Sequence, residues 1–592
     1  MTDAPATPPA PESPQVSARL DENDLPWPGR PWVMVAIGSI AGLLFHMLVD
    51  RKYAAEPAPL LDALAAFVAV ATVVFLLGVE RRRWHWAAGF ALVWGAVIGL
   101  ITWHSAAYNL HGSPFEWPFW SGILAVLVAT PLFQTRRDVA GDWRFWKLWQ
   151  MPYDRLHSHA WADAVIGAAA LVDVAVNFLL IILIGQMFHL IGIDLIQNLL
   201  NDEWFGWMLA GGAFGSAVGL LRERDKLVTT LQRLVMVILS VLAPVLAAAL
   251  VIFLLSLAGT GLAKLWASGF STAALMMAAA AFAVLLANAV IGNGKDERPG
   301  NRILHVAAAV LVATVLPLAV IAFYSMHLRV IQYGWTPERL WGVIAAIIAL
   351  SYGVVGVWSV ARGRHDFDDL LRPLQQKLAI GLMLLAAFLA LPILDFGAIS
   401  TRDQVARLKS GAVKTEKFDW AAMAFDFGPS GRKALAGLAK SDDRMRANLA
   451  AWALKAKDRW DLNGAGYGTD LNDVTFAAKK IEEKVRVFPV GAKLPPEAYA
   501  LLGTRGECKT SPCIAYRLGE GRIAVASSGN NLTLFVRDPG GTDWKEDSRA
   551  FLRGGSSPSL TTYELEHATA EVRQVTRQQV FVNGKPVGED FE

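Results

Sequence analysis

Long apolar runs separated by short polar loops fill the first two thirds of the chain. A helix needs roughly 20 residues to cross a hydrocarbon core about 30 Å thick, and its backbone polar groups must be satisfied internally. The pattern therefore predicts a mainly α-helical fold class, a polytopic membrane bundle of about eleven transmembrane helices within residues 31–394. The predicted spans are residues 31–49, 60–79, 84–103, 117–133, 164–191, 204–221, 234–257, 272–292, 303–323, 340–361 and 377–394.

The composition is that of a protein whose main partner is the lipid bilayer. Hydrophobic residues make up 54% of the 592 positions and charged residues 18%, below the roughly 25% of soluble domains. The net charge is +3 and no basic stripe is present, which argues against a nucleic-acid partner. Many of the 22 tryptophans flank apolar runs, as the aromatic belts at a membrane interface do.

Lysine and arginine are divided unevenly between the two sets of loops. The positive-inside rule places the richer set in the cytoplasm. One set carries about 18 of these residues and the alternate set about 5. The sequence therefore predicts a cytoplasmic N-terminus and a C-terminal region outside, which in a bacterium means the periplasmic side of the inner membrane. The richer set comprises Arg81, Arg82, Arg83, Arg136, Arg137, Arg144, Lys147, Arg155, Arg222, Arg224, Lys226, Lys295, Arg298, Arg302, Arg362, Arg364, Arg372 and Lys377.

The regions on either side of the bundle differ from it in pattern. Residues 1–30 are rich in Pro and Ala, which predicts a disordered cytoplasmic tail. Residues 395–470 have helical periodicity and end in the Gly-rich segment 463–470, which predicts a helical periplasmic stalk and a flexible joint. Residues 471–592 alternate between apolar and polar positions, which predicts a small β-rich domain. Its expected strands are residues 485–490, 514–518, 522–527, 532–537 and 579–582.

The chain has two cysteines, Cys508 and Cys513, both in the expected outer domain. In an oxidising compartment they would form a disulfide, which would contribute roughly 2 kcal/mol in the chain-entropy model. Zinc binding is the competing use. No second cysteine pair exists and His567 is the one histidine in this region, so we favour the disulfide.

The join between the last span and the outer domain carries a motif. It reads LPILDFGAISTRDQVARLKSGAV, followed by KFDWAAMAFDFGPSGRKAL. This motif and the many spans before it resemble the bacterial multi-pass membrane family called domain of unknown function 4153. The resemblance implies a bacterial inner-membrane protein with its tail outside, and it implies no activity, cofactor or catalytic residue. The residues that carry it are Ser400, Gln404, Arg407, Leu408, Gly411, Phe418, Asp419, Phe425, Gly428 and Gly431.

Polar residues in and before the fifth span are the main candidates for chemistry. At 3.6 residues per turn, His159, Asp163, Asp173 and Asn177 fall within one narrow sector of a helix. A charged side chain at a helix centre is costly and usually faces a cavity or a partner. The stripe would suit a proton or cation path. The alternatives are an Asp173 near the interface, or a neutral Asp173 that hydrogen-bonds Asn177 or a neighbouring helix.

Glycines at four-residue spacing mark helix faces that can approach one another closely. We expect packing inside the bundle, although the moving helices of a transporter would use the same feature. The spacing occurs at Gly38 and Gly42, at Gly95 and Gly99, and at Gly211, Gly215 and Gly219.

Two further groups of polar residues raise the question of metal binding. Histidines occur near both expected membrane faces, and residues 365–369 read HDFDD. Interfacial histidine is common, the spacing matches no calcium loop, and acids near a helix start are favoured by the macrodipole. We therefore predict no metal and no cofactor. No phosphate-binding loop, nucleophile elbow or HExxH motif occurs, so the sequence does not indicate an enzyme.

Two classes of function remain. The first is a transport or channel-like protein in which the bundle is active and the outer domain is accessory. The second is an envelope scaffold or sensor whose outer domain binds a periplasmic protein partner. A bundle of this size exceeds what an anchor requires, which favours transport. An enzyme acting on a lipid-linked substrate is a weaker third alternative, and the sequence indicates no oligomeric state.

Overall fold

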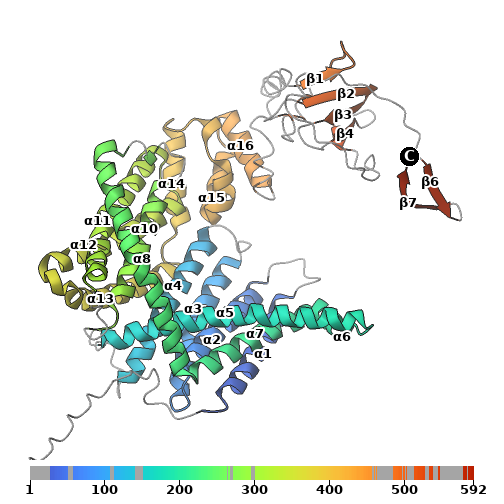
Figure 1. Cartoon of the computed structure of the whole chain (residues 1–592). Helices are drawn as coiled ribbons and strands as arrows, with labels where there is room; N and C mark the ends of the chain where they lie inside the picture. Colours follow the sequence, from blue (N-terminus) through green and yellow to red (C-terminus); the bar gives the residue numbers. More distant parts are fainter. Residues whose placement is uncertain are drawn as a thin grey trace, which may run out of the picture. The chain divides into compact units, whose positions relative to one another are not determined.

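The computed structural model (Figure 1) divides into two compact units: Met1–Gln404 with Asp426–Ser430, and Val405–Phe425 with Gly431–Glu592. The expected tail up to residue 26, the joint at 463–470 and the turn at 529–531 lie outside the described residues. The structure describes residues 27–50, 58–106, 113–139, 151–262, 265–266, 271–294, 301–456, 459, 462, 485–495, 498–499, 502, 508, 513–519, 521–526, 532–537, 544–546, 578–582 and 585–591.

The first unit is a bundle of long apolar helices, which confirms the expected mainly helical membrane fold. Ten segments of the described chain are long and apolar enough to cross a membrane. The last of them, Pro337–Ala390, contains two helices, so each of the eleven expected spans corresponds to one helix. The helices are α1 (Arg30–Val49), α2 (Pro59–Gly78), α3 (Trp84–Ala106), α4 (Ser113–Val139), α5 (Tyr153–Leu190), α6 (Leu195–Asn201), α7 (Glu203–Arg222), α8 (Asp225–Thr260), α10 (Thr272–Ile291), α11 (Arg302–Tyr333), α12 (Pro337–Gly363) and α13 (Phe367–Ala390).

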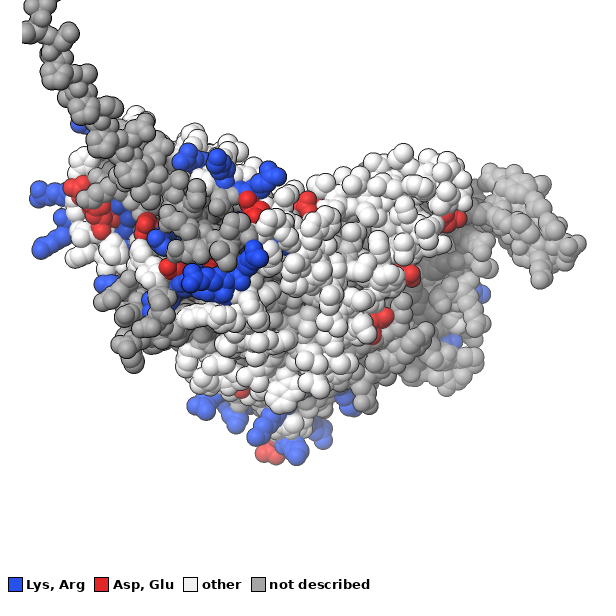
Figure 2. Space-filling model, turned by 90° about the horizontal axis from the view of Figure 1, so that it is seen from below, with Lys and Arg blue, Asp and Glu red and all other residues white. Residues whose placement is uncertain are grey.

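Large apolar side chains cover much of the outside of this unit. Leu171 and Leu179 of α5, and Val245 and Ile252 of α8, are all more than 60% exposed. On the face seen in Figure 2, Lys and Arg gather in patches, and a broad area carries almost no charge. Such a surface is unfavourable in water and favourable in hydrocarbon, which fits a membrane protein.

Helices α1 and α7 pack backbone to backbone. A Cβ atom on Gly211 would overlap the carbonyl oxygen of Gly38, and a Cβ atom on Gly38 would overlap the carbonyl oxygen of Gly211. Gly42, Gly215 and Gly219 meet the main chain of the facing helix in the same way. The two helices can therefore lie this close only because these positions carry no side chain.

The second glycine pair lies between α3 and α2. A Cβ atom on Gly99 would come within 3.1 Å of the carbonyl oxygen of Ala63, and one on Gly95 within 2.9 Å of the methyl carbon of Ala71. This contact is less tight than that of α1 with α7. A methyl group here would require the neighbouring helix to shift by a few tenths of an ångström.

A short 3₁₀ turn, η3 (Arg364–Asp366), joins α12 to α13 and is held at several points. Nε2 of His305 donates to the carbonyl oxygen of His365 at 2.8 Å. Arg372 pairs with the fully buried Asp368 at 2.8 Å and donates to the carbonyl oxygen of Ile291 at 2.8 Å. An acid of the HDFDD segment thus pairs with an arginine, and in the described part of the chain no three His, Cys, Asp or Glu side chains are grouped to hold a metal.

Helix α14 (Phe396–Lys409) follows the last span and is held by hydrogen bonds from its middle residues. Nε2 of Gln404 donates to the carbonyl oxygens of Tyr333 and Trp335 at 2.9 and 3.0 Å. Oδ2 of Asp403 accepts from the amide of Trp335 at 2.8 Å. The first compact unit therefore extends to Gln404, ten residues beyond the expected end of the bundle at 394.

The remaining motif residues lie on both sides of the chain boundaries between the two units. Leu408 and Phe418 are 0% and 1% exposed. Oδ1 of Asp419 accepts from the first amide of the π-helix η5 (Ala422–Asp426) at 2.8 Å. Gly411 and Gly428 have φ angles of +77° and +64°, a region that favours glycine. The family-like motif is thus a set of structural positions at the junction.

The second unit continues as short helices and then as strands, which confirms a β-rich C-terminal part. Its five-stranded sheet has the order β1-β2-β3-β4-β5, with β1 parallel to β2 and the other neighbours antiparallel. Strands β5 and β7 were not expected from the sequence. The elements are η4 (Thr415–Lys417), α15 (Gly428–Leu438), α16 (Arg444–Lys455), β1 (Val485–Phe488), β2 (Cys513–Gly519), β3 (Arg522–Ala526), β4 (Leu532–Arg537), β5 (Trp544–Glu546) and the separate antiparallel pair β6 (Gln578–Val582) with β7 (Lys585–Phe591).

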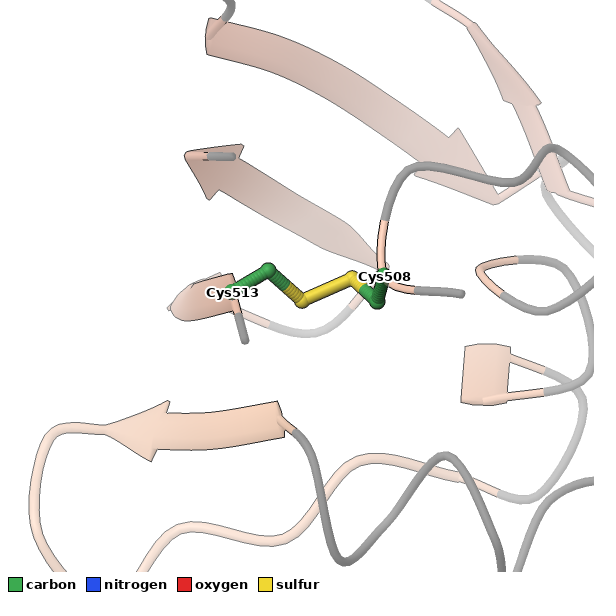
Figure 3. Close-up of a disulfide and its surroundings, with 2 residues drawn as sticks. All are labelled: Cys508 and Cys513. Carbon is green, nitrogen blue, oxygen red and sulfur yellow. A yellow bond between two sulfur atoms is a disulfide. The ribbon is translucent and has the colours of Figure 1, made fainter. Parts of the chain in front are cut away.

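Figure 3 shows Cys508 and Cys513 joined by a disulfide at the edge of β2. Their Cα atoms are 5.5 Å apart, and both side chains are fully buried. They pack in the core of the sheet with Phe535 of β4, which is also fully buried. The pair therefore closes a short loop directly onto the hydrophobic core of this domain.

The contact between α1 and α7 yields a stability prediction. Gly211→Ala should destabilise the protein by roughly 1–3 kcal/mol, because its methyl group can enter only if the helices separate. Gly206→Ala on the same helix is the matched control, since a Cβ atom there meets nothing within 4 Å. Thermal unfolding of the two purified variants in detergent should show a lowered midpoint for the first alone. Equal midpoints would mean that the helices do not lie this close.

Candidate functional site

A cavity of about 710 Å³ lies inside the helical unit, lined by residues of α4, α5, α10, α11, α12 and α13. Most of its lining side chains are apolar. Leu124 of α4 and Leu285 of α10 line the cavity and are 41% and 38% exposed, so the cavity is open rather than sealed. Spaces of this size hold small organic molecules.

Alanines create this space. Ala160 and Ala164 on α5 are four residues apart, as are Ala345 and Ala349 on α12, and all four line the cavity. Residues four apart lie on the same face of a helix. Ala379 of α13 lines it as well. Because methyl groups reach only a short distance from each helix, they leave the centre of the contact unfilled.

Polar side chains from the first turns of α5 and α13 line one part of the cavity. His157 is 6% exposed, and its Nδ1 lies 3.2 Å from the hydroxyl of Tyr153. That hydroxyl donates to Oε1 of Gln375 at 3.3 Å. Since the hydroxyl proton goes to Gln375, Nδ1 of a neutral His157 donates to the hydroxyl and Nε2 is left as an acceptor. This tautomer is assigned from the hydrogen-bond pattern.

Two acceptors in this polar part of the cavity have no partner among the described residues: Nε2 of His157 and Oδ1 of Asn288. A buried acceptor without a hydrogen bond costs roughly 1–3 kcal/mol. Among the neighbouring polar groups, Gln376 donates to a backbone carbonyl at 3.0 Å, and the charge of Arg372 is paired with Asp368. His157 and Asn288 line the cavity, but these two acceptor atoms are themselves covered by neighbouring atoms. A ligand in the cavity would reach them after a rotation of the lining side chains, and it would meet acceptors rather than an unpaired charge.

A separate ion-pair cluster lies where the ends of α2 and α4 meet the first turns of α5. Arg137 and Glu80 are both 1% exposed and form a salt bridge. Arg83 adds a second bond to Glu80 at 3.0 Å. Asp138 accepts from Nε of Arg137 at 3.1 Å and lies 2.8 Å from Nε2 of His159. Each of these buried charges has an opposite charge beside it, so the cluster fastens the helix ends.

The four polar residues expected on one face of α5 form two separate pairs. His159 and Asp163 belong to the cluster region, where Gln134 of α4 donates to Oδ1 of Asp163 at 3.0 Å. Asp173 and Asn177 lie further along the helix and are half-buried. Nδ2 of Asn177 donates to Oδ2 of Asp173 at 3.0 Å, the local arrangement that was the alternative to a conduction path.

Apolar residues separate these two pairs. Ile166 and Ala170 occupy the same face of α5 between Asp163 and Asp173, and they are 4% and 0% exposed. Both pack in a hydrophobic cluster with residues of α1, α2 and α7. The described residues of α5 therefore form no continuous polar path, and neither Asp173 nor Asn177 lines the large cavity.

Sequence reasoning missed the residues that give the cavity its polar part. These are Tyr153, His157, Asn288, Gln375 and Gln376. The sequence signal that could have indicated them is that they are uncharged polar side chains within a turn or two of the ends of apolar runs. Such residues are common at membrane interfaces, so nothing in the sequence indicates that these three helices share one cavity.

A protein-family model described as Domain of unknown function (DUF4153) matches residues 34–436, more than half of the 592-residue chain. The chain belongs to this family. No curated protein and no solved structure matches it.

The region matched by the DUF4153 model contains every helix that lines the cavity, and it ends within α15. The five-stranded sheet lies beyond it. The matched region therefore covers the helical bundle and the motif from Ser400 to Gly431, and it does not include the C-terminal sheet.

The ion-pair cluster can be tested by removing one charge. Arg137→Gln should destabilise the protein by roughly 3–5 kcal/mol, because it leaves Glu80 buried without its partner. Arg362→Gln, a change of the same chemistry at an exposed position, is the control and should shift stability by less than about 0.5 kcal/mol. The measurement is thermal unfolding with the yield of folded protein. A tolerated Arg137→Gln would mean that the cluster does not hold the helix ends.

Proposed function

We propose that this DUF4153 protein binds an amphipathic molecule dissolved in the membrane and moves it across the bilayer. The observation that carries the proposal is the open cavity of about 710 Å³ with apolar walls and buried polar groups in one part. An apolar chain would lie along the alanine and leucine walls. A polar head would reach the groups on α5, α10 and α13.

The chemistry of the head follows from the unpaired atoms. Nε2 of His157 and Oδ1 of Asn288 are both acceptors, so the fitting head donates hydrogen bonds. A hydroxyl or an ammonium group meets this requirement, whereas a carboxylate does not. The ligand class is therefore an alkyl chain with a hydrogen-bond-donating head.

We further propose that the protein lies in a bacterial inner membrane, with the N-terminus in the cytoplasm and the C-terminal domain in the periplasm. The loop charges support this orientation, about 18 against about 5. The disulfide between Cys508 and Cys513 supports an oxidising compartment for the C-terminal domain.

The second candidate function is that of an envelope scaffold or sensor, in which the C-terminal domain binds a periplasmic partner. The sheet lies outside the region that the family model matches. This supports an accessory role for the domain in transport, or a partner specific to this chain. Deleting residues 485–592 separates the two: transport requires that ligand binding survive, whereas a scaffold loses its function.

Ligand binding can be tested by photolabelling the full chain in nanodiscs with an alkyl amine that carries a diazirine in its chain. We expect labelled peptides from α5, α12 and α13. Alkyl alcohol and alkyl amine competitors should reduce the labelling, and an alkyl carboxylate of equal length should not. Labelling spread evenly over the lipid-facing helices would contradict the proposal.

A matched pair of variants on α5 sharpens this test. Ala164→Trp places a large side chain in the cavity and should reduce specific labelling at least fivefold. Ala175→Trp adds the same side chain at an exposed position that does not line the cavity and should leave labelling unchanged. Equal labelling of both variants would show that the cavity is not the binding site.

The orientation predicts the behaviour of the cysteines. In intact cells, Cys508 and Cys513 should resist a membrane-impermeant maleimide and react with it after a reductant is added. A cysteine introduced at the exposed Arg82, which lies in a loop expected to be cytoplasmic, should stay unlabelled in both conditions. Labelling of Arg82→Cys in intact cells would overturn the proposed orientation.

A further inference from the structure

A second cavity, of about 350 Å³, lies in the same helical unit. Its lining includes Trp117 of α4, Trp341 of α12 and Phe396 of α14, together with the polar residues His104 and Asp395. The rings of Trp117 and Trp341 are stacked with centroids 5.3 Å apart, and Phe396 meets Trp341 edge-on at 5.5 Å. This cavity is therefore aromatic, with one carboxylate at its edge.

The two cavities lie along the same three helices and in the same order. On α4 the small cavity is lined by Trp117 and Pro118 and the large one by Leu124. On α12 the corresponding residues are Trp341 and Ala345.

Helix α13 runs in the opposite direction and gives the same order. Leu389 and Ala390 near its end line the small cavity, and Leu382 and earlier residues line the large one. At 1.5 Å per residue, the lined positions on each of the three helices are about 6–10 Å apart. The order of lining residues on all three helices therefore places the two cavities one after the other along the helix axes, one to two helical turns apart.

The short stretch between the cavities is closed by contact between helices. Ser121 of α4 is 4% exposed, and its hydroxyl donates to the carbonyl oxygen of Ala386 of α13 at 2.9 Å. A Cβ atom on the adjacent Gly122 would lie 2.5 Å from Cδ1 of Ile98. Both Ser121 and Ala386 fall between the residues that line the two cavities, so this hydrogen bond spans the barrier.

We propose that the aromatic cavity is a second binding station for the same ligand, on one route with the large cavity, and that the contact of Ser121 with Ala386 closes the route. The inference rests on the proposed function. The ligand class is consistent at both stations. In the first cavity a hydrogen-bond-donating head would meet the acceptors of His157 and Asn288, and in the second it would meet the carboxylate of Asp395.

The chemistry of the aromatic cavity narrows the ligand further. Oδ1 of Asp395 accepts from the amide of Ala398 at 2.8 Å, and Oδ2 accepts from the hydroxyl of Ser430 at 3.1 Å. Each carboxylate oxygen keeps a free lone pair, and Asp395 is exposed. An exposed carboxylate attracts an ammonium group more strongly than a neutral hydroxyl. The station therefore favours an alkyl amine over an alkyl alcohol.

The test is the accessibility of single cysteines in the full chain, in right-side-out membrane vesicles without reductant. Leu389→Cys in the aromatic cavity should react with a membrane-impermeant thiol reagent from outside. Ala379→Cys in the large cavity should react slowly. Adding Ser121→Ala should raise the reaction rate of Ala379→Cys about two- to tenfold, since a hydrogen bond of this kind contributes roughly 0.5–1.5 kcal/mol.

Ser240→Ala is the matched control. Its hydroxyl also bonds across a helix contact, donating to the carbonyl oxygen of Ala289 at 3.2 Å, but it lies on α8 and lines neither cavity. It should leave the rate at Ala379→Cys unchanged. An alkyl amine should also slow the reaction of Leu389→Cys, and an alkyl alcohol should slow it less.

The outcomes separate this inference from the proposed function. If photolabelling of the large cavity occurs but Ser121→Ala leaves the reaction rate of Ala379→Cys unchanged, the route is wrong and ligand binding stands. If Ser240→Ala raises the rate as much as Ser121→Ala, the barrier is not at Ser121 and the inference fails. Absence of photolabelling in the large cavity would contradict the proposed function, on which this inference rests.

Discussion

A polar atom placed among apolar helices has to find its partner inside the protein, and this requirement shapes the bundle. Arg137 meets Glu80, Gln404 meets two carbonyl oxygens, and Ser121 meets the carbonyl of Ala386. Each of these contacts joins segments far apart in the sequence. In lipid no water competes for the same atoms, so such contacts fix which helices are neighbours.

Two residues that line the large cavity do not meet this requirement for an internal partner. His157 and Asn288 keep acceptors unpaired in a space that alanines leave open. Gln376, which lines the same cavity, donates to the carbonyl oxygen of Met151. The residues that carry these atoms also line the unfilled volume, and the two observations together support ligand binding.

The fold was largely predictable, because apolar runs of bilayer length and paired glycines are local signals. Every expected span became a helix, and the glycines of α1 and α7 lie face to face. The site was not predictable, because its polar residues come from three helices whose proximity depends on tertiary packing. The sequence singles out Asp173 as an acid within a predicted span, and its hydrogen-bond partner is Asn177 on the same helix. Strand β5 could not be predicted, because three residues are too few to show an alternation of apolar and polar positions.

The tight connection between α12 and α13 has a mechanical consequence. Both helices line both cavities, and the turn that joins them is pinned through His305 and Arg372. Because α12 and α13 are held together at this turn, they can separate only at their far ends. Displacement would therefore grow from the large cavity toward the aromatic one, and a small rotation near the turn would suffice to pull Ala386 away from Ser121.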